Sequence, residues 1–364
     1  MKHSNPYNPT DAVSPSYFAG RRDVLSRAEE VYSASLNGSS GGILLTGHRG
    51  IGKTSALRAM ESRLEKGTPI VRFRVSHEIT VDDFVSELLG RCRASVGDWD
   101  PSFGITEIRL PIITVKKEPR NRNEDTPGVA MLRMLKSLRN APVLWLSLDD
   151  IDLVQGDALS LLKSAMEETT GPTIVMAVAG GPYLRDRLIS EHSPVIRFFS
   201  GSDFDLANFS IQETREALEL PIRNVSPRVI WEEGAIEEVH KLTGGYPYLV
   251  QCLAYSTYRE GTIKAEEVRA SLNRGLKIAG TWMEREIPDA SDKDIREFGK
   301  IADAGKSDWS SSEFGELGIE PIYVGRLVKL GVLRKKARGH YSLVKPPMIA
   351  RYHLIRRGLI REKL

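Results

Sequence analysis

The segment from Gly47 to Thr54, with the sequence GHRGIGKT, constrains the fold of this 364-residue chain more than any other feature. It matches the pattern G-x-x-x-x-G-K-[ST], in which the glycines let successive backbone N–H groups surround phosphate oxygens. Lys53 is then expected to reach the β- and γ-phosphates, and the Thr54 hydroxyl to ligate Mg²⁺. An apolar run at 42–46 and a helix-like stretch at 55–64 predict the strand–loop–helix that such a loop requires. A glycine-rich turn without a ligand is the alternative interpretation.

Length and composition indicate a globular protein of two or three domains. No apolar run approaches 18 residues and the first ten residues are polar, which predicts neither a membrane span nor a secretory signal. We therefore expect a cytoplasmic protein without membrane contact. Cys92 and Cys252 are isolated from one another, so neither a disulfide framework nor a zinc site is expected.

Residues 20–206 alternate apolar strands with amphipathic stretches, the pattern of a parallel sheet wrapped by helices. The predicted strands are 43–46, 70–75, 142–148 and 173–178. An insert at 96–128 is expected to hold a short hairpin and a charged loop. From Ser210 the period becomes helical, with a capping-box pattern and predicted helices at 211–220, 233–242, 246–258 and 265–272.

The third predicted strand runs directly into Asp149 and Asp150. An apolar strand that ends in paired carboxylates resembles a Walker B element. In that role Asp149 holds Mg²⁺, directly or through water, and Asp150 orients an attacking water. The alternative is an acidic helix cap after a core strand.

The C-terminal segment 321–364 carries twelve Lys or Arg residues and one acid, Glu362, for a net charge of +11. The whole chain has a net charge of +3, so the first 320 residues sum to 3 − 11 = −8. A basic segment on an acidic body favours a module that faces a polyanion. A solvated basic tail is the alternative.

The same segment has the element order of a winged helix-turn-helix. Helices are predicted at 292–304, 311–317 and 320–330, and strands at 332–336 and 341–344. In the third helix a core face is expected for Ile322, Val324, Leu327 and Val328. The residues predicted to contact duplex DNA are Tyr323, Arg326 and Lys329 on another face of that helix and Arg334, Lys335, Lys336 and Arg338 on the wing. A protein partner at this surface is the alternative.

The phosphate loop, the paired aspartates, the box Phe18-Ala19-Gly20-Arg21 and the segment TGGYPY at 243–248 together resemble the AAA+ and STAND ATPases. The likeness is strongest to prokaryotic ATPases of the origin-recognition clade. It implies an α/β fold with a P-loop NTPase parallel sheet of the AAA+ type at 1–206, a helical lid at 207–280 and a winged helix-turn-helix at 281–364.

The resemblance also implies ATP or ADP with Mg²⁺ as cofactors, duplex DNA as a partner, and assembly with further copies or other protein subunits. The nucleotide-contacting residues that it implies are Phe18, Arg21, Gly47, His48, Arg49, Gly50, Ile51, Gly52, Lys53, Thr54, Ser55 and Pro247. Read without the family, the segment at 244–247 is a tight turn that opens a helix.

Three departures from the family pattern predict slow hydrolysis. Asp150 stands where efficient hydrolases often carry Glu, one methylene longer. Ala179-Gly180-Gly181 follows the fourth strand without the polar side chain usual at that position. Pro247 stands where many AAA+ proteins have a sensing arginine, which leaves Arg197 as the best match to an arginine finger acting on a neighbouring subunit. A surface arginine in a salt bridge is the alternative for Arg197.

These observations predict an ATP-binding, slowly hydrolysing switch that controls a DNA-binding winged helix. The alternative is a signalling or defence ATPase whose winged helix mediates oligomerisation or partner binding. A degenerate, purely structural nucleotide site is disfavoured because Lys53, Thr54 and Asp149 are all present.

Overall fold

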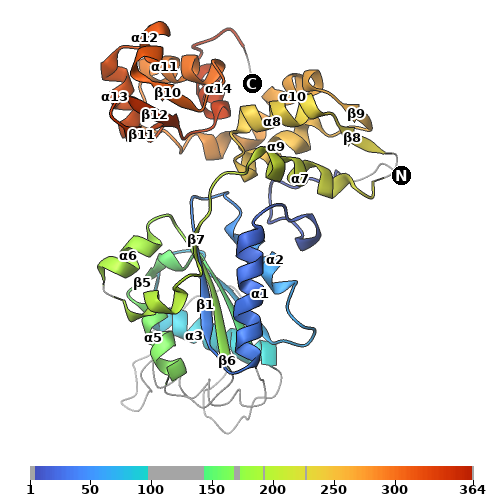
Figure 1. Cartoon of the computed structure of the whole chain (residues 1–364), viewed down its shortest axis with the longest axis vertical. Helices are drawn as coiled ribbons and strands as arrows, with labels where there is room; N and C mark the ends of the chain where they lie inside the picture. The colour runs from blue at the N-terminus through green and yellow to red at the C-terminus, as the bar shows by residue number, and fades with distance from the viewer. Residues whose placement is uncertain (1–4, 97–142, 168–172, 192, 226–227, 363–364) are drawn as a thin grey trace, which may run out of the picture. The chain divides into compact units, whose positions relative to one another are not determined.

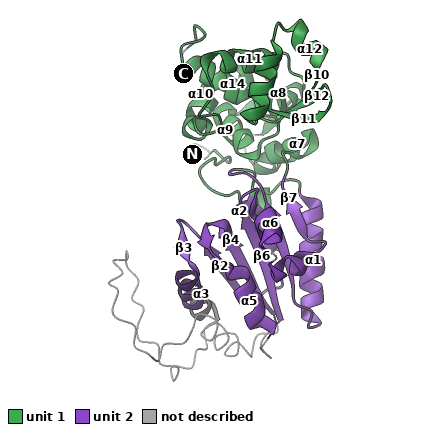
Figure 2. Ribbon diagram, turned by 90° about the vertical axis from the view of Figure 1, so that its left-hand side faces the viewer, with its two compact units in different colours: residues 1–20, 50–52, 207–364 green, residues 21–49, 53–206 purple. Residues whose placement is uncertain are grey.

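The computed structural model describes residues 5–96, 143–167, 173–191, 193–225 and 228–362 (Figure 1). The predicted hairpin and charged loop of the insert fall within 97–142 and lie outside these residues. The chain divides into two compact units (Figure 2). The sheet unit comprises 21–49 and 53–206, and the helical unit comprises 1–20, 50–52 and 207–364.

The sheet unit is built on a five-stranded sheet in the order β2-β4-β6-β1-β7. All neighbouring strands are parallel, so their carboxyl ends meet at one edge. The four strands predicted from apolar runs are confirmed, and the short fifth strand was missed. The strands are β1 (Gly41–Thr46), β2 (Ile70–Arg74), β4 (Val143–Asp149), β6 (Thr173–Gly180) and β7 (Asp203–Asp205).

Every residue of β4 is buried, because helices cover both faces of a parallel sheet. Helices α1 (Arg22–Leu36) and α2 (Lys53–Glu61) pack on one another and on β6 (Figure 1). Helix α3 (Val81–Val96) packs on β2 and on α5 (Ala158–Glu167). The core between these elements fixes the edge at which the strands end.

Short elements connect the strands of this unit. A 3-10 turn, η2 (Ile151–Leu153), follows β4 and leads into β5 (Val154–Gln155), which pairs with β3 (Ile79–Thr80). Helix α6 (Leu184–Ser190) follows β6, and the 3-10 helix η3 (Pro194–Phe199) precedes β7.

The helical unit begins with the N-terminal segment, which contains the 3-10 turn η1 (Pro15–Tyr17). The Tyr7 hydroxyl anchors this segment, since it donates to the Leu218 carbonyl and accepts a 2.8 Å hydrogen bond from Trp231 Nε1. The predicted capping box is confirmed, with Ser210 Oγ accepting from the Glu213 amide at 3.2 Å.

The four predicted helices of this part are present, and the last is longer than predicted. They are α7 (Ile211–Glu219), α8 (Glu233–Thr243), α9 (Pro247–Thr257) and α10 (Ala265–Met283). The 3-10 turn η4 (Leu220–Ile222) and a parallel pair of short strands, β8 (Val229–Trp231) and β9 (Gly261–Ile263), were not predicted.

The C-terminal part of the helical unit has the predicted three helices and two strands, with two further elements. Strands β10, β12 and β11 form an antiparallel sheet in that order. The elements are α11 (Asp292–Asp303), β10 (Asp308–Ser310), α12 (Ser311–Glu316), α13 (Pro321–Lys329), β11 (Leu333–Ala337), β12 (His340–Leu343) and α14 (Pro347–Arg356). Trp309 stacks on Phe314 at 5.5 Å between ring centroids and closes the small core.

The prediction for the core face of α13 is wrong at one residue. Val324 and Leu327 are buried, but Ile322 is 66% exposed. Ile322 precedes Val324 by two residues, which is about 200° around a helix, so both cannot face the same core. Val328 is half-buried.

Candidate active site

The phosphate loop connects the end of β1 to the start of α2 at Lys53. Three of its residues, Gly47, Gly50 and Gly52, have positive φ angles of 147°, 88° and 100°. Residues with a Cβ rarely adopt this backbone, so the glycines of the motif are needed for the shape of the loop itself. Within the loop His48 and Arg49 are exposed and Ile51 is buried, while Ser55 lies in the first turn of α2.

The Lys53 side chain is folded against the loop that precedes it. Its ammonium donates to the carbonyls of Gly47 at 2.8 Å and His48 at 3.2 Å. Burial lowers the pKa of Lys53, and the carboxylates of Asp150, Asp149 and Asp152 oppose that shift. A buried ammonium held by two neutral carbonyls suits a polyphosphate, which offers it a full negative charge.

The Thr54 hydroxyl donates a 2.6 Å hydrogen bond to Asp149 Oδ2. Asp149 is the last residue of β4 and is 4% exposed. Burial raises the pKa of Asp149, and the bond from Thr54 opposes that shift. A buried carboxylate beside a hydroxyl supplies the hard oxygen ligands that Mg²⁺ takes together with substrate phosphates, so these two residues fit the cation.

Among the described residues, no group of three or more His, Cys, Asp or Glu side chains is arranged to hold a metal ion. Mg²⁺ that is bound together with a nucleotide needs only one or two protein ligands and completes its shell with water and phosphate oxygens.

Asp150 follows Asp149 in a left-handed backbone conformation with φ of 55°. Its Oδ2 accepts a 3.1 Å hydrogen bond from Arg74 Nε, which also lies 3.9 Å from Asp149 Oδ2. Arg74 is the last residue of β2 and is in register with Asp149 of β4. Arg74 was not predicted as a site residue, although apolar and charged residues alternate in the sequence from Val71 to Arg74.

A third carboxylate, that of Asp152, was also missed. Its Oδ1 accepts a 2.8 Å hydrogen bond from the Gly181 amide just after β6. The signal for it was the acidic run Asp149-Asp150-Ile151-Asp152, in which only the first two acids were interpreted.

The remaining predicted nucleotide residues lie at the ends of elements. Phe18 follows η1, Arg21 precedes α1 with φ of 53°, and Pro247 is the first residue of α9. Contact between these residues and a nucleotide stays a prediction. Arg197 is exposed in η3, and within the described part of the chain its side chain has no salt bridge.

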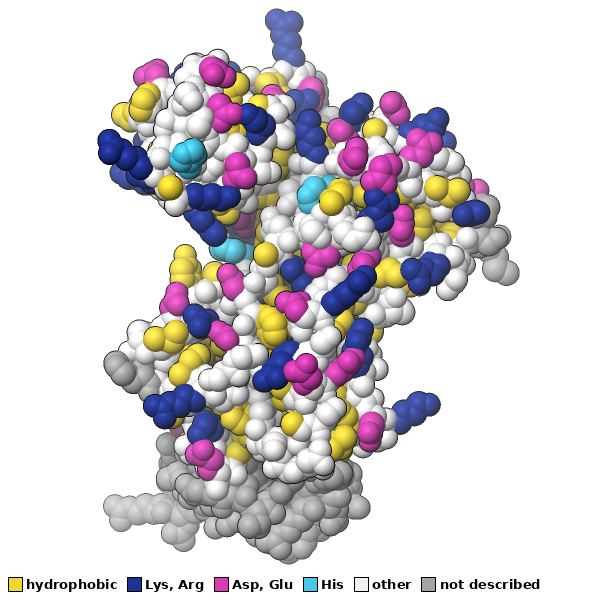
Figure 3. Space-filling model, viewed as in Figure 1, with side chains coloured by type: hydrophobic (Ala, Val, Ile, Leu, Met, Phe, Trp, Pro, Cys, Tyr) yellow, Lys and Arg dark blue, Asp and Glu magenta, His cyan; other side chains and the backbone are white. Residues whose placement is uncertain are grey.

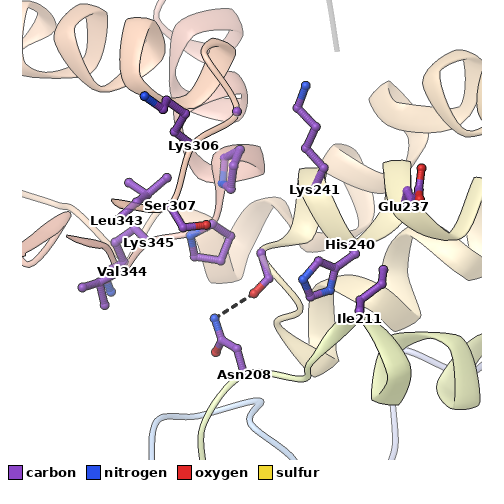
Figure 4. Close-up of a pocket in the computed structure, with 14 residues that line it drawn as sticks. Asn208, Ile211, Glu237, His240, Lys241, Lys306, Ser307, Leu343, Val344 and Lys345 are labelled. Atoms are coloured by element: carbon purple, nitrogen blue, oxygen red, sulfur yellow. Dashed lines mark hydrogen bonds between the residues drawn. The ribbon is translucent and has the colours of Figure 1, made fainter. Parts of the chain in front are cut away.

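A hollow lies elsewhere, in the helical unit (Figure 4). It measures about 450 Å³ between α8 and the residues that connect β12 to α14. Asn208 donates a 3.0 Å hydrogen bond to the Gly244 carbonyl at its wall, and none of the predicted site residues lines it. This hollow is therefore separate from the phosphate-loop chemistry.

The predicted basic face of α13 differs from expectation at Arg326. Its guanidinium donates two hydrogen bonds to Asp294 of α11, at 2.7 and 2.5 Å, and the Asp294 side chain is fully buried. Arg326 therefore neutralises a buried acid in this structure. Tyr323, on the same helix, has Lys293 Nζ 5.5 Å from its ring centroid.

The predicted wing, which is β11, β12 and the turn between them, carries most of the predicted DNA-contacting residues that have no ion pair in the described part of the chain. Lys336 pairs with Asp308 at 2.6 Å, where a bulge interrupts the register of β11 with β12. The other predicted contact residues are exposed and, in the part of the chain that the structure describes, have no ion pair: Lys329, Arg334, Lys335 and Arg338. Figure 3 shows Lys and Arg side chains at the edge of the C-terminal part, with acidic side chains among them.

The charge of the C-terminal part is partly balanced from within. Residues 281–364 hold 17 Lys or Arg and 12 Asp or Glu, because the stretch at 281–320 is acidic. Ion pairs such as Lys345–Glu286 and Arg357–Asp292 join the two stretches.

Comparisons with known proteins identify the class of fold. Residues 17–176 match the family described as AAA ATPase domain. With the strand order of the sheet and the phosphate loop, this match identifies a P-loop ATPase fold of the AAA+ type. No curated protein matches the chain.

Three solved structures share the fold over nearly the whole chain. The Walker-type ATPase PABY2304 of Pyrococcus abyssi is 17% identical, with a TM-score of 0.54, and covers 97% of this chain and 98% of its own. The ORC2 protein of Aeropyrum pernix is 12% identical, with a TM-score of 0.52 and coverages of 92% and 94%. Cdc6p of Pyrobaculum aerophilum is 12% identical, with a TM-score of 0.51 and coverages of 97% and 96%. Of the helices described here, none has both the length and the apolar character needed to cross a membrane.

Proposed function

We propose that this protein is a cytoplasmic ATPase switch that binds ATP or ADP with Mg²⁺, hydrolyses ATP slowly and binds duplex DNA according to its nucleotide state. In this proposal residues 1–206 form the ATPase, 207–280 the lid and 281–364 a winged helix. The observation that carries it is the convergence of Lys53, Thr54 and Asp149 at the carboxyl edge of one parallel sheet. The AAA ATPase match at 17–176 supports the nucleotide part.

Each residue of the site has one task in the proposed reaction. Lys53 would exchange its loop carbonyls for phosphate oxygens. Thr54 and Asp149 would hold Mg²⁺, which would supply positive charge to the phosphates. Asp150 orients the attacking water. Its short side chain and its ion pair with Arg74 both weaken that role, and they support slow turnover.

The exposed cations of the wing support the DNA part of the proposal. Arg334, Lys335 and Arg338 present charge without a protein counterion among the described residues. Cations of this kind bind DNA phosphates and release condensed counterions. We further propose that the ATPase acts as an oligomer, in which Arg197 of one copy serves the nucleotide of its neighbour.

Lys53→Ala tests the nucleotide site. We expect isothermal calorimetry to show loss of ATP and ADP binding in this variant, because a methyl group cannot replace the ammonium that meets the phosphates. Lys163→Ala is the matched control, since Lys163 pairs with Glu167 on α5 of the same unit. Equal ATP affinity in wild type and Lys53→Ala would exclude this loop as the binding site.

A fluorescence-anisotropy titration with duplex DNA, in ATP and in ADP and at several salt concentrations, tests the second part. We expect affinity to fall as salt rises. No salt-sensitive binding in either nucleotide would favour the alternative function, a signalling or defence ATPase with a protein partner at this surface. The compensation of Arg326 by Asp294 is the observation that favours that alternative.

A further inference from the structure

The end of β6 occupies a central place in the site and carries no polar side chain of its own. β6 lies between β4 and β1 in the sheet. Gly180 is in register with Thr46, the residue before the phosphate loop, and Val178 is in register with Leu148, the residue before Asp149. A polar group at this strand end would therefore lie between the loop and the Walker B aspartates.

The carboxylate of Asp152, together with the Leu184 side chain, fills the space that such a side chain would take. A Cβ at Gly180 would lie 2.4 Å from Leu184 Cδ2 and 2.8 Å from Asp152 Oδ1, and a Cβ at Gly181 would lie 3.0 Å from Asp152 Oδ2. All three distances are shorter than side chains tolerate without movement. The two glycines thus leave room for a carboxylate that comes from the loop after the neighbouring strand.

Asp152 is held from two sides. The Gly181 amide donates to its Oδ1 at 2.8 Å, and Arg187 Nη1 donates to its backbone carbonyl at 3.2 Å. Its side chain is half-buried, and Oδ2 has no hydrogen-bond donor among the residues that the structure describes. Asp152 is also close enough to Lys53 to raise that ammonium's pKa against the effect of burial. One oxygen is fixed, and the other is available to a ligand of the site.

We propose that Asp152 is a catalytic carboxylate of this ATPase and supplies, from the turn η2 that follows β4, the polar group that β6 lacks. This inference rests on the proposed ATPase function. In the reaction, Oδ2 of Asp152 accepts a hydrogen bond from the attacking water and Asp150 accepts the proton that the water loses. The water oxygen bonds to the γ-phosphorus while the bond from that phosphorus to the β–γ bridging oxygen breaks, and ADP leaves with the electron pair.

The test compares Asp152→Ala and Asp152→Asn with wild type. Asp152→Asn keeps an oxygen for the Gly181 amide but replaces the acceptor at Oδ2 by an N–H donor, so both variants should lower turnover at least tenfold. We expect MgADP affinity, measured by calorimetry, to stay within threefold of wild type. Affinity for MgADP with aluminium fluoride, which imitates the transferring phosphoryl group, should fall with turnover.

Asp157→Ala is the matched control. Asp157 is also half-buried in the same unit, and its Oδ1 accepts a backbone N–H, from Ser160 at 2.9 Å. Loss of that bond should leave turnover and both affinities unchanged. If Asp152→Ala fails to fold, as judged by circular dichroism, Asp152→Asn decides the question because it retains the bond to Gly181.

A rescue variant separates chemistry from local structure. The three heavy atoms nearest to a Cβ at Gly181 in the described part of the chain all belong to Asp152, so the space opens when Asp152 is truncated. Asp152→Ala/Gly181→Asn should recover at least threefold in turnover over Asp152→Ala, because a polar side chain then comes from the residue that directly follows β6.

The outcomes distinguish this inference from the proposed function. If wild type binds neither ATP nor ADP, the proposed function fails. If wild type binds nucleotide and Lys53→Ala does not, but the Asp152 variants match wild type in turnover and in affinity for the fluoride complex, only the role of Asp152 is overturned.

Discussion

Arg74 Nε lies 3.1 Å from Oδ2 of Asp150, so the proposed water-orienting acid is ion-paired in this structure. The pair joins the ends of two neighbouring strands, β2 and β4, and a cation in this position competes with water for the carboxylate. The Arg74 side chain is 64% exposed and that of Asp150 is 33% exposed. Solvent therefore screens the pair, and its strength is in the range of about 0–1 kcal/mol that exposed ion pairs show.

Arg74→Ala should release Asp150 and raise ATP turnover. An interaction of up to about 1 kcal/mol corresponds to an increase of up to roughly fivefold, because 1.36 kcal/mol is a factor of ten in rate. A steady-state phosphate-release assay measures this effect. Arg72→Ala is the control. Arg72 lies on the same strand as Arg74 and pairs with Glu61 of α2, so its loss should leave turnover unchanged. A fall in turnover for Arg74→Ala would show that Arg74 assists the reaction.

The parts of the site that the sequence predicted are those that depend on neighbouring residues in the chain. Lys53 and Thr54 follow the loop directly, and the pair Asp149-Asp150 ends an apolar run, so each could be recognised locally. Arg74 could not be assigned, because its role depends on β2 lying beside β4 in the sheet. Asp152 depends on the close approach of a carboxylate to two glycines 28 and 29 residues later.

The same distinction applies to the fold and to the C-terminal part. Long apolar runs marked four strands of the central sheet, whereas β7 has three residues and no such run. The basic residues of α13 were visible, but the buried acid that pairs with Arg326 comes from α11 and could be found only from packing. Periodicity indicated a core face for α13 but not its limits, as Ile322 shows.

Gly245→Ala should destabilise the helical unit strongly. Gly245 has a φ of 68°, and a Cβ there would lie 2.1 Å from the Phe209 carbonyl oxygen, which belongs to rigid backbone. We expect a loss of at least about 2 kcal/mol in the free energy of unfolding, because backbone strain adds to a steric clash.

Gly234→Ala is the contrasting variant, since a Cβ in that turn of α8 meets nothing within 4 Å among the described residues. It should add about 0.5–1 kcal/mol. Urea unfolding measures both, and equal stabilities would refute the assigned turn.

We expect the free energy of unfolding to fall at acid pH because Asp294 becomes protonated. Hydrogen bonds from Arg326, followed by those from Ser291, hold the pKa of Asp294 well below its usual range, against the effect of burial. A carboxyl whose pKa is lower in the folded state stabilises the fold above its unfolded pKa near 4, and that contribution is lost as pH falls below it. Glu313, with a pKa lowered to about 2 mainly by Lys306, acts in the same direction.

Asp294→Asn tests this account by urea unfolding between pH 7 and pH 2.5. The variant should be less stable than wild type at pH 7, because Arg326 then meets a neutral amide. As the pH falls, the urea midpoint of the variant should change less than that of wild type. A pH dependence as steep as that of wild type would show that other carboxyls govern acid unfolding. Far-ultraviolet circular dichroism at pH 7 checks that the variant is folded.

If the proposed wing binds DNA, substitutions there should weaken binding most at residues whose charge has no counterion in the protein. Arg334 and Lys335 have no ion pair in the described part of the chain, whereas Lys336 shares its charge with Asp308. If each of the first two meets a phosphate, Arg334→Ala and Lys335→Ala should each reduce the slope of log affinity against log salt by about 0.9. Lys336→Ala should have a smaller effect. Arg269→Ala, which removes a cation of α10 that is paired with Glu238, should have none. These losses should be the same on every duplex sequence, because phosphate contacts carry no base information. Anisotropy titrations at four salt concentrations give the slopes, and equal slopes for wild type and all four variants would assign the wing to a partner other than DNA.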